Sequence, residues 1–166
     1  REIKKAVNLR HILINTKPVI DERKSVSLFD TITIVPSKKN YRVELAKTGK
    51  FKIEEIKENE AGKKISKITD KKILKGKKTQ LNLIDGKNFL SDIKCKVNDS
   101  VLINFRDKKV EKCLPLKENA NAIVFDWKHA GKSGIIKSIK EEKKMAEIEI
   151  DKKLVNVLIK QFMVVE

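Results

Sequence analysis

The stretch TQLNLIDGKNFL, Thr79–Leu90, contains the clearest structural signal in this chain. Apolar and polar residues alternate on both sides of the pair Asp85-Gly86, which is the period of a strand with one buried face. An Asp-Gly pair between two such flanks is the strongest short signal for a β-hairpin, because these residues tolerate the positive φ that the turn needs. The sequence therefore predicts two antiparallel strands joined at Asp85-Gly86.

The same signals recur on both sides of this hairpin. Five further strands alternate in the same way and belong to one central unit: Tyr41–Ala46, Phe51–Ile56, Lys63–Leu74, Val101–Phe105 and Val110–Leu116. Short polar segments separate them and predict turns: Lys47–Lys50, Lys75–Lys77 and Arg106–Lys109. Repeated short strands with turns between them indicate a mainly β protein.

The two ends of the chain extend this pattern. Residues 1–9 place Ile3, Ala6 and Val7 on one face, which predicts the end of a helix. Strands follow within residues 11–35, with a turn at residues 15–18. After Asn119, four short strands fall within fewer than 50 residues, with a hairpin tip at residues 140–144, and this density is typical of a small SH3-like barrel. We expect three domains, at residues 1–36, 37–118 and 119–166, with one short N-terminal helix.

The charge is strongly positive. The chain carries 39 Lys and Arg against 23 Asp and Glu, a net charge of +16, and residues 37–118 hold +11 of it (23 basic, 12 acidic). Such a field attracts polyanions, with nucleic acid the first candidate and an anionic membrane surface the second. Only five of the basic residues are Arg, which favours contact with a phosphate backbone over reading of base edges. Charges interrupt every apolar stretch, so no membrane span is expected.

The stretch DWKHAGKS, Asp126–Ser133, ends like a nucleotide-binding phosphate loop. That motif needs glycine at its first position and a helix after it, whereas Asp126 stands first and Gly134–Ile150 alternates like strands. We therefore expect no nucleotide hydrolysis, no cofactor and no small-molecule substrate. Cys95 and Cys113 lie too far apart in sequence for a zinc-finger pattern, so we expect reduced thiols and no metal site.

Three stretches, in this order, resemble a known family. They are residues 1–34, ending in FDTITI, then TQLNLIDGKNFL, and finally AIVFDWKHAGKSGIIKSI, residues 122–139. They are similar to the S-four-like RNA-binding module, the central domain and the C-terminal KOW element of archaeal and eukaryotic small-subunit ribosomal protein S-four, extended "e" type. Because the chain begins at Arg1 and the first part of that module has no counterpart, we expect a fragment of a longer protein.

The sequence departs from the family pattern at two turns. Thr16 stands where the family has glycine, so we expect this turn to avoid positive φ and to change shape. Asp126 and Trp127 replace a Gly-Gly pair. Trp127 either caps the barrel core or stacks on a base. The six Phe residues fall mostly at apolar strand positions, which argues against a platform of exposed rings.

The resemblance implies a structural component of the small ribosomal subunit, located on cytoplasmic ribosomes, that binds ribosomal RNA beside neighbouring ribosomal proteins and catalyses nothing. RNA contacts are expected from three groups of residues: Arg1, Lys4, Lys5, Arg10 and Lys17 at the helix and first turn; Lys63, Lys64, Lys75, Lys77 and Lys78 on two strands and their turn; and Lys128, His129, Lys132 and Ser133 on the KOW loop. Alternation divides the strand lysines between two faces, so about half of them could reach RNA.

Two other functions fit parts of the sequence. A KOW-containing regulator of transcription or translation would bind a protein partner through an apolar patch on the barrel. An RNA-modifying enzyme with the same small RNA-binding module would need a separate catalytic domain, for which the chain has no room. The two histidines, His11 and His129, accompany no nucleophile motif.

Overall fold

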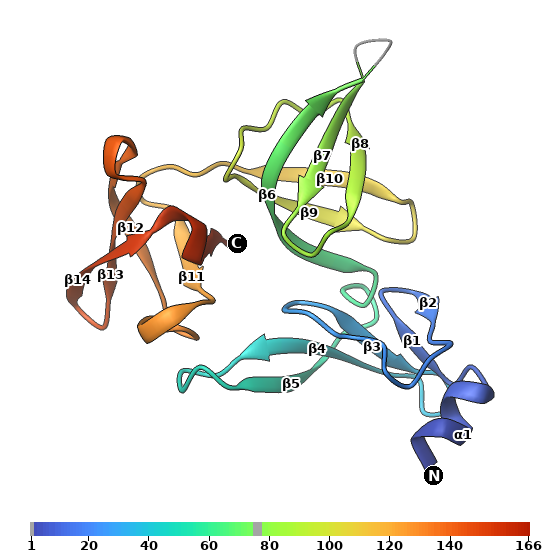
Figure 1. The fold of residues 1–166 in the computed structure, drawn as a ribbon. Coiled ribbons are helices and arrows are strands. Elements are labelled where there is room, and N and C mark those ends of the chain that lie inside the picture. The colour runs from blue at the N-terminus through green and yellow to red at the C-terminus, as the bar shows by residue number, and fades with distance from the viewer. Residues whose placement is uncertain (1, 75–77) are drawn as a thin grey trace.

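Three antiparallel sheets and one short α-helix form the framework of the described part of the chain. The computed structural model describes residues 2–74 and 78–166, and it confirms a mainly β fold with a helix, α1 (Glu2–Asn8), at its N-terminal end (Figure 1). Each sheet has five strands. Among the described residues, no helix is long and apolar enough to cross a membrane.

The first sheet has the strand order β2-β1-β3-β4-β5. Its strands are β1 (Ile12–Ile14), β2 (Lys17–Pro18), β3 (Thr31–Ile34), β4 (Lys39–Leu45) and β5 (Phe51–Ile56). The predicted hairpin around residues 47–50 is confirmed, with Leu45 opposite Phe51. β4 also pairs with β3, Arg42 opposite Thr31, so the first sheet continues across the domain boundary expected after residue 36. The division into three domains stays a prediction.

The turn between β1 and β2 differs from its prediction. Asn15 and Thr16 both adopt positive φ, 49° and 67°, and join the paired residues Ile14 and Lys17. The expectation that Thr16 would avoid positive φ was wrong, because tertiary hydrogen bonds hold the turn. Asn15 Oδ1 accepts from the backbone N–H of Thr31 at 3.1 Å, and Asn15 Nδ2 donates to Asp30 at 2.7 Å.

The second sheet has the order β10-β9-β6-β7-β8. Its strands are β6 (Lys63–Ile73), β7 (Thr79–Leu83), β8 (Asn88–Ser91), β9 (Ser100–Asn104) and β10 (Lys109–Leu114). The hairpin predicted at Asp85-Gly86 is confirmed, with Thr79 opposite Ser91 and Gly86 at φ 76°. The turn predicted at residues 75–77 lies outside the described residues. Ile68, Leu81, Val101 and Ile103 are fully buried and form the core.

The third sheet has the order β14-β13-β12-β11-β15. Its strands are β11 (Asn121–Val124), β12 (Ser133–Lys140), β13 (Met145–Ile150), β14 (Lys153–Leu158) and β15 (Phe162–Val164). The four predicted strands are confirmed. Three short 3-10 helices connect them: η2 (Trp127–His129), η3 (Glu141–Lys143) and η4 (Ile159–Gln161). η3 occupies the hairpin tip expected at residues 140–144. Phe162 and Ile148 are fully buried in the core of this unit.

Each sheet, together with the segments that connect its strands, is called a unit below. A buried lysine joins the second unit to the third. Lys67 on β6 is 2% exposed, and its Nζ donates to the carbonyl oxygens of Ile159 and, at 2.7 Å, of Phe162. The same Nζ lies 5.1 Å from the centre of the Phe162 ring. Burial lowers the pKa of Lys67 to about 8, whereas the two carbonyls and the ring face stabilise the ammonium and oppose that shift.

Two turns that are distant in sequence join the first sheet to the third unit. A Cβ atom on Gly131, after η2, would lie 1.8 Å from the carbonyl oxygen of Ala46, at the end of β4. A Cβ on Gly49, which lies with Ala46 in the turn between β4 and β5, would lie 3.5 Å from Cβ of Ala130. The backbones therefore touch, and only glycine fits at position 131.

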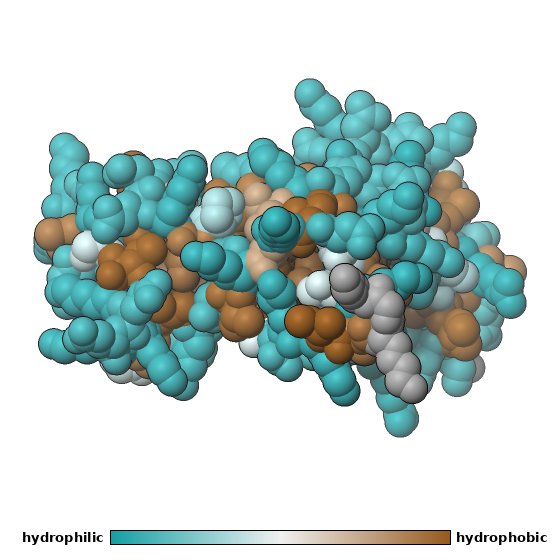
Figure 2. All heavy atoms as spheres, turned by 90° about the horizontal axis from the view of Figure 1, so that it is seen from above, coloured by the Kyte–Doolittle hydropathy of each residue, from teal (hydrophilic) through white to brown (hydrophobic). Residues whose placement is uncertain are grey.

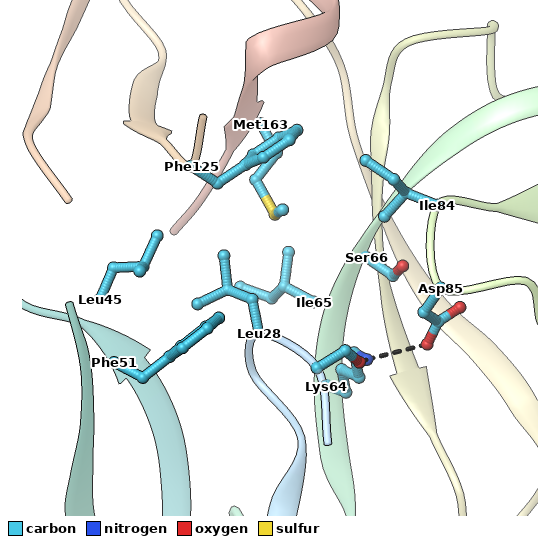
Figure 3. A pocket seen from close by; sticks show the side chains of 11 residues that line it. Leu28, Leu45, Phe51, Lys64, Ile65, Ser66, Ile84, Asp85, Phe125 and Met163 are labelled. Atoms are coloured by element: carbon cyan, nitrogen blue, oxygen red, sulfur yellow. Dashed lines mark hydrogen bonds and ion pairs between the residues drawn. The ribbon is translucent and has the colours of Figure 1, made fainter. Parts of the chain in front are cut away.

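The three units meet around a small apolar pocket of about 220 Å³. Figure 3 shows Leu28, Leu45 and Phe51 of the first unit facing Ile65 of β6 and Phe125 and Met163 of the third unit. Lys64 and Asp85 close one polar corner of the pocket. The junction is thus mainly apolar, with one ion pair at its edge.

Candidate nucleic-acid interface

The first predicted group of RNA-binding residues lies around α1 and the β1–β2 turn. Val7 is the buried residue of α1, so the helix presents Lys4 and Lys5 to solvent. Arg10 lies two residues after the helix, with φ 55°, and is also exposed. Lys17 is exposed at the start of β2. The fifth predicted residue, Arg1, lies outside the described residues.

A groove of about 910 Å³ runs between this region and the second sheet. Lys17 lines it, together with three lysines that sequence reasoning missed: Lys24, Lys87 and Lys108. Apolar side chains also line it, including Phe89 and Leu90 of β8. No local pattern could have found these lysines, because they come from segments up to 84 residues apart in the chain that only the tertiary fold brings together.

The second predicted group is divided by the structure. Lys78 is exposed, and Lys63 is partly exposed and pairs with Glu111 at 2.8 Å. Lys75 and Lys77 lie outside the described residues. Lys64 is 3% exposed, so its ammonium group cannot meet a phosphate at the surface. Alternation along β6 turns Lys64 inward, and its predicted role in RNA binding was wrong.

Lys64 instead sits between two buried carboxylates. Its Nζ donates to Asp30 at 2.7 Å, to Asp85 at 2.8 Å and to Ser27 Oγ at 2.9 Å. Burial raises the pKa of Asp30 and of Asp85, but the hydrogen bonds and charge of Lys64 outweigh it, and both pKa values lie below the ordinary value. Lys87 adds a second cation 3.2 Å from Asp85. The cluster joins the first and second sheets.

The third predicted group lies on η2 and the residues after it. Lys128 and Ser133 are exposed, and His129 and Lys132 are partly buried. Lys132 lies 3.5 Å from the carboxylate of Asp151, so it is partly neutralised. A strand, β12, follows this loop. A nucleotide-binding phosphate loop would be followed by a helix.

Trp127 begins η2 and points away from the core. It is 71% exposed, so the alternative in which it caps the core was wrong. Its φ is 64°, the conformation that glycine adopts at low cost. Its backbone N–H donates to the carboxylate of Asp126 at 2.8 Å.

Several acidic side chains at the surface pair with lysines. Lys52 lies 2.6 Å from Glu54, and Lys137 lies 2.8 Å from Glu149. The hydrogen bond from Lys52 holds the pKa of Glu54 below its usual value. Figure 2 shows the outcome on one face: hydrophilic side chains cover most of it, and hydrophobic atoms appear between them in small patches. These carboxylates thus offset part of the positive charge at the surface.

The cysteines lie in the core of the second unit. Cys95 is buried, and Cys113 is partly buried against the same cluster. Burial raises the pKa of the Cys113 thiol far above its usual range, which keeps it protonated. Within residues 2–74 and 78–166, no three metal-binding side chains come together.

Three antiparallel sheets with exposed lysines on each unit define a β-rich, polycationic protein. Residues 37–110 match the model of a family described as ribosomal family S4e. Over 139 residues, the chain is 32% identical to the small ribosomal subunit protein eS4 of Nanoarchaeum equitans and 35% identical to that of Methanocella arvoryzae. These alignments cover 84% of this chain but 59% and 58% of the two relatives, so the chain spans about three fifths of their length.

A solved structure supports the same assignment at the level of the fold. The crystal structure of the 30S ribosomal protein S4e from Thermoplasma acidophilum superposes with a TM-score of 0.82, over 97% of this chain and 83% of that chain, at 21% identity. The chain is thus similar to the ribosomal S4e family, in sequence over residues 37–110 and in fold over nearly its whole length.

Proposed function

We propose that this protein is a structural component of the small ribosomal subunit and that it binds ribosomal RNA without catalysing a reaction. The observation that carries the proposal is the spread of exposed lysines over all three units, beside a net charge of +16. A protein surrounded by folded RNA needs cations on several faces, because each face meets a different part of the phosphate backbone. The names of the relatives agree with this role.

The proposed RNA contacts come from the residues that the structure leaves at the surface. They are Lys4, Lys5, Arg10, Lys17, Lys63, Lys78, Lys128, His129, Lys132 and Ser133, joined by the groove residues Lys24, Lys87 and Lys108. Part of the same proposal are the location on cytoplasmic ribosomes, the neighbouring ribosomal proteins, and an SH3-like KOW barrel for residues 119–166. Lysines reach phosphates as point charges, so this surface favours the shape of folded RNA over its sequence.

Two measurements test the proposal. The first is the affinity of the protein for small-subunit ribosomal RNA between about 50 and 300 mM salt. Each neutralised phosphate steepens the log–log slope by roughly 0.7–0.9, so we expect a steep fall in affinity. The second is sedimentation of the native protein in a cell extract, where it should travel with the small subunit. An affinity that hardly changes with salt, or a protein that sediments free of ribosomal particles, contradicts the proposal.

The alternative of a regulator that binds a protein partner gains no support from the third unit. That function calls for a continuous apolar patch. Ile135 and Leu154 are exposed there, but both pair across the sheet with Glu149, which lies between them on β13. A charged residue therefore interrupts the apolar surface at this position.

A further inference from the structure

Two turns from separate units form one exposed surface. Residues 46–50 join β4 to β5, and residues 125–132 lead from β11 to β12. They touch where Gly131 meets the carbonyl of Ala46 and where Ala130 meets Gly49. Because Gly131 has φ 83° and no space for a Cβ, the contact fixes the two turns relative to each other.

This surface carries cations, and the ring of Trp127 is exposed on it. Lys47 and Lys50 are exposed on the first turn, and Lys128 is exposed on the second. Trp127 is 71% exposed within the same turn, three residues before Ala130. Asp126 contributes one carboxylate, but its side chain accepts the N–H of Trp127 and so holds the start of η2. The three lysines outnumber this single acid.

The position of Trp127 is costly for the folded protein. A large side chain at φ 64° is strained, and the residue is 71% exposed, so its side chain contributes little to core packing. The ring is thus free to contact a ligand, and neighbouring ammonium groups make that ligand anionic. An aromatic face beside lysines fits an unpaired nucleotide, which offers a base for stacking and phosphates on both sides.

We propose that Trp127 stacks on an unpaired RNA base and that Lys47, Lys50 and Lys128 hold the flanking phosphates. This inference rests on the proposed function and names a class of target within it: a single-stranded loop or bulge, in contrast to the duplex backbone met by the other lysines. It also assigns RNA contact to the β4–β5 turn, which belongs to a different sheet from the η2 loop.

The chain contains a single tryptophan, so its fluorescence reports on this site alone. The experiment titrates the protein with a single-stranded RNA oligonucleotide and, separately, with an RNA duplex of equal length. Binding is followed by the anisotropy of a dye on the RNA, and stacking is followed by quenching of Trp127. We expect single-stranded RNA to quench the fluorescence, and the duplex to bind without comparable quenching.

Substitutions test the contribution of each residue to RNA binding. Trp127→Ala should weaken single-stranded binding by about 5- to 100-fold and leave duplex binding nearly unchanged. Lys47→Ala with Lys50→Ala should weaken the same interaction without removing the reporter. Lys143→Ala, an exposed lysine on η3 at the other end of β12, is the matched control and should have little effect. Circular dichroism confirms that each variant folds.

The outcomes separate the two proposals. RNA that raises the anisotropy but leaves Trp127 unquenched overturns the stacking site and leaves the proposed function standing. Equal quenching by duplex and single strand overturns the preference for unpaired bases. Absence of any RNA binding overturns both. If an acidic protein quenches Trp127 and RNA does not, the surface is a protein-binding site and the inference is wrong.

Discussion

The ammonium group of Lys64, on β6, lies 2.7 Å from Oδ1 of Asp30, the residue before β3. Both side chains are at least 95% buried, and Asp85 lies on the other side of the same ammonium at 2.8 Å. This contact links the first sheet to the second, so Lys64 stabilises the folded protein. A buried cation between two carboxylates is also the place where removing one partner has the largest effect.

We predict that Lys64→Met lowers the free energy of unfolding by about 3–5 kcal/mol, because two carboxylates then remain buried without their cation. Urea unfolding followed by circular dichroism measures the change. Lys63→Met is the control, since the adjacent Lys63 pairs with Glu111 in a partly exposed position, and it should lower the free energy by less than about 1 kcal/mol. Equal stability of the two variants would contradict the structural role of Lys64.

The stability of the protein should also depend on pH through Lys67. Its pKa is lowered to about 8 in the folded protein, below the ordinary 10.5, so between these values the unfolded chain binds more protons. The contribution of Lys67 to the free energy of unfolding therefore rises as the pH increases from about 8 to 10.5, by no more than about 3 kcal/mol. The measurement compares urea unfolding of the protein and of Lys67→Met at pH 7.5 and 10. Parallel pH dependence in both would show that the shift is absent.

Replacing Thr16 by glycine should stabilise the protein. A β-branched residue at φ 67° is strained, and glycine adopts this conformation freely, although it gains entropy in the unfolded chain. We expect a net gain of about 0.5–1 kcal/mol, measured as a shift in the midpoint of urea unfolding. Thr33→Gly in β3, where φ is not positive, should destabilise instead. A loss of stability in Thr16→Gly would show that the turn carries no strain.

Ser100 offers a second stabilising substitution. Its hydroxyl is fully buried at the start of β9 and finds no hydrogen-bond partner among the residues that the structure describes. Ser100→Ala removes an unsatisfied polar group and should raise the free energy of unfolding by about 1 kcal/mol. Thermal unfolding provides the readout. A decrease of similar size would mean that the hydroxyl has a partner in solution, such as a bound water.

The exposed helix lysines should act on RNA affinity and not on folding. Lys4→Ala with Lys5→Ala is expected to reduce the log–log salt slope of RNA binding by about 1 to 2 and to leave the unfolding midpoint nearly unchanged. Asn8→Ala is a neutral change at an exposed position of the same helix and serves as the control. An unchanged slope in the double variant would remove the helix from the interface.

The strands could be predicted from the sequence because each depends on a local period of two and a turn signal. Thr79–Leu90 shows this best, since Asp85-Gly86 determines both the turn and its register. The site was harder to predict. Alternation indicates that Lys63 and Lys64 face opposite sides of β6, but it does not say which of the two is buried. Lys64 is buried because it pairs with Asp30 and Asp85, which lie 34 and 21 residues from it in the chain. Phe51 was expected at an apolar strand position, yet it is 66% exposed because β5 is an edge strand.

The buried ammonium of Lys67 has a consequence for synthesis. Its two acceptors, the carbonyls of Ile159 and Phe162, follow it by 92 and 95 residues, so they leave the translating ribosome long after the strand that carries the lysine. Domains fold in order as the chain emerges, and the nascent middle sheet must keep this cation hydrated in the meantime. Docking of the C-terminal strand therefore requires this ammonium group to exchange its water for the two carbonyls.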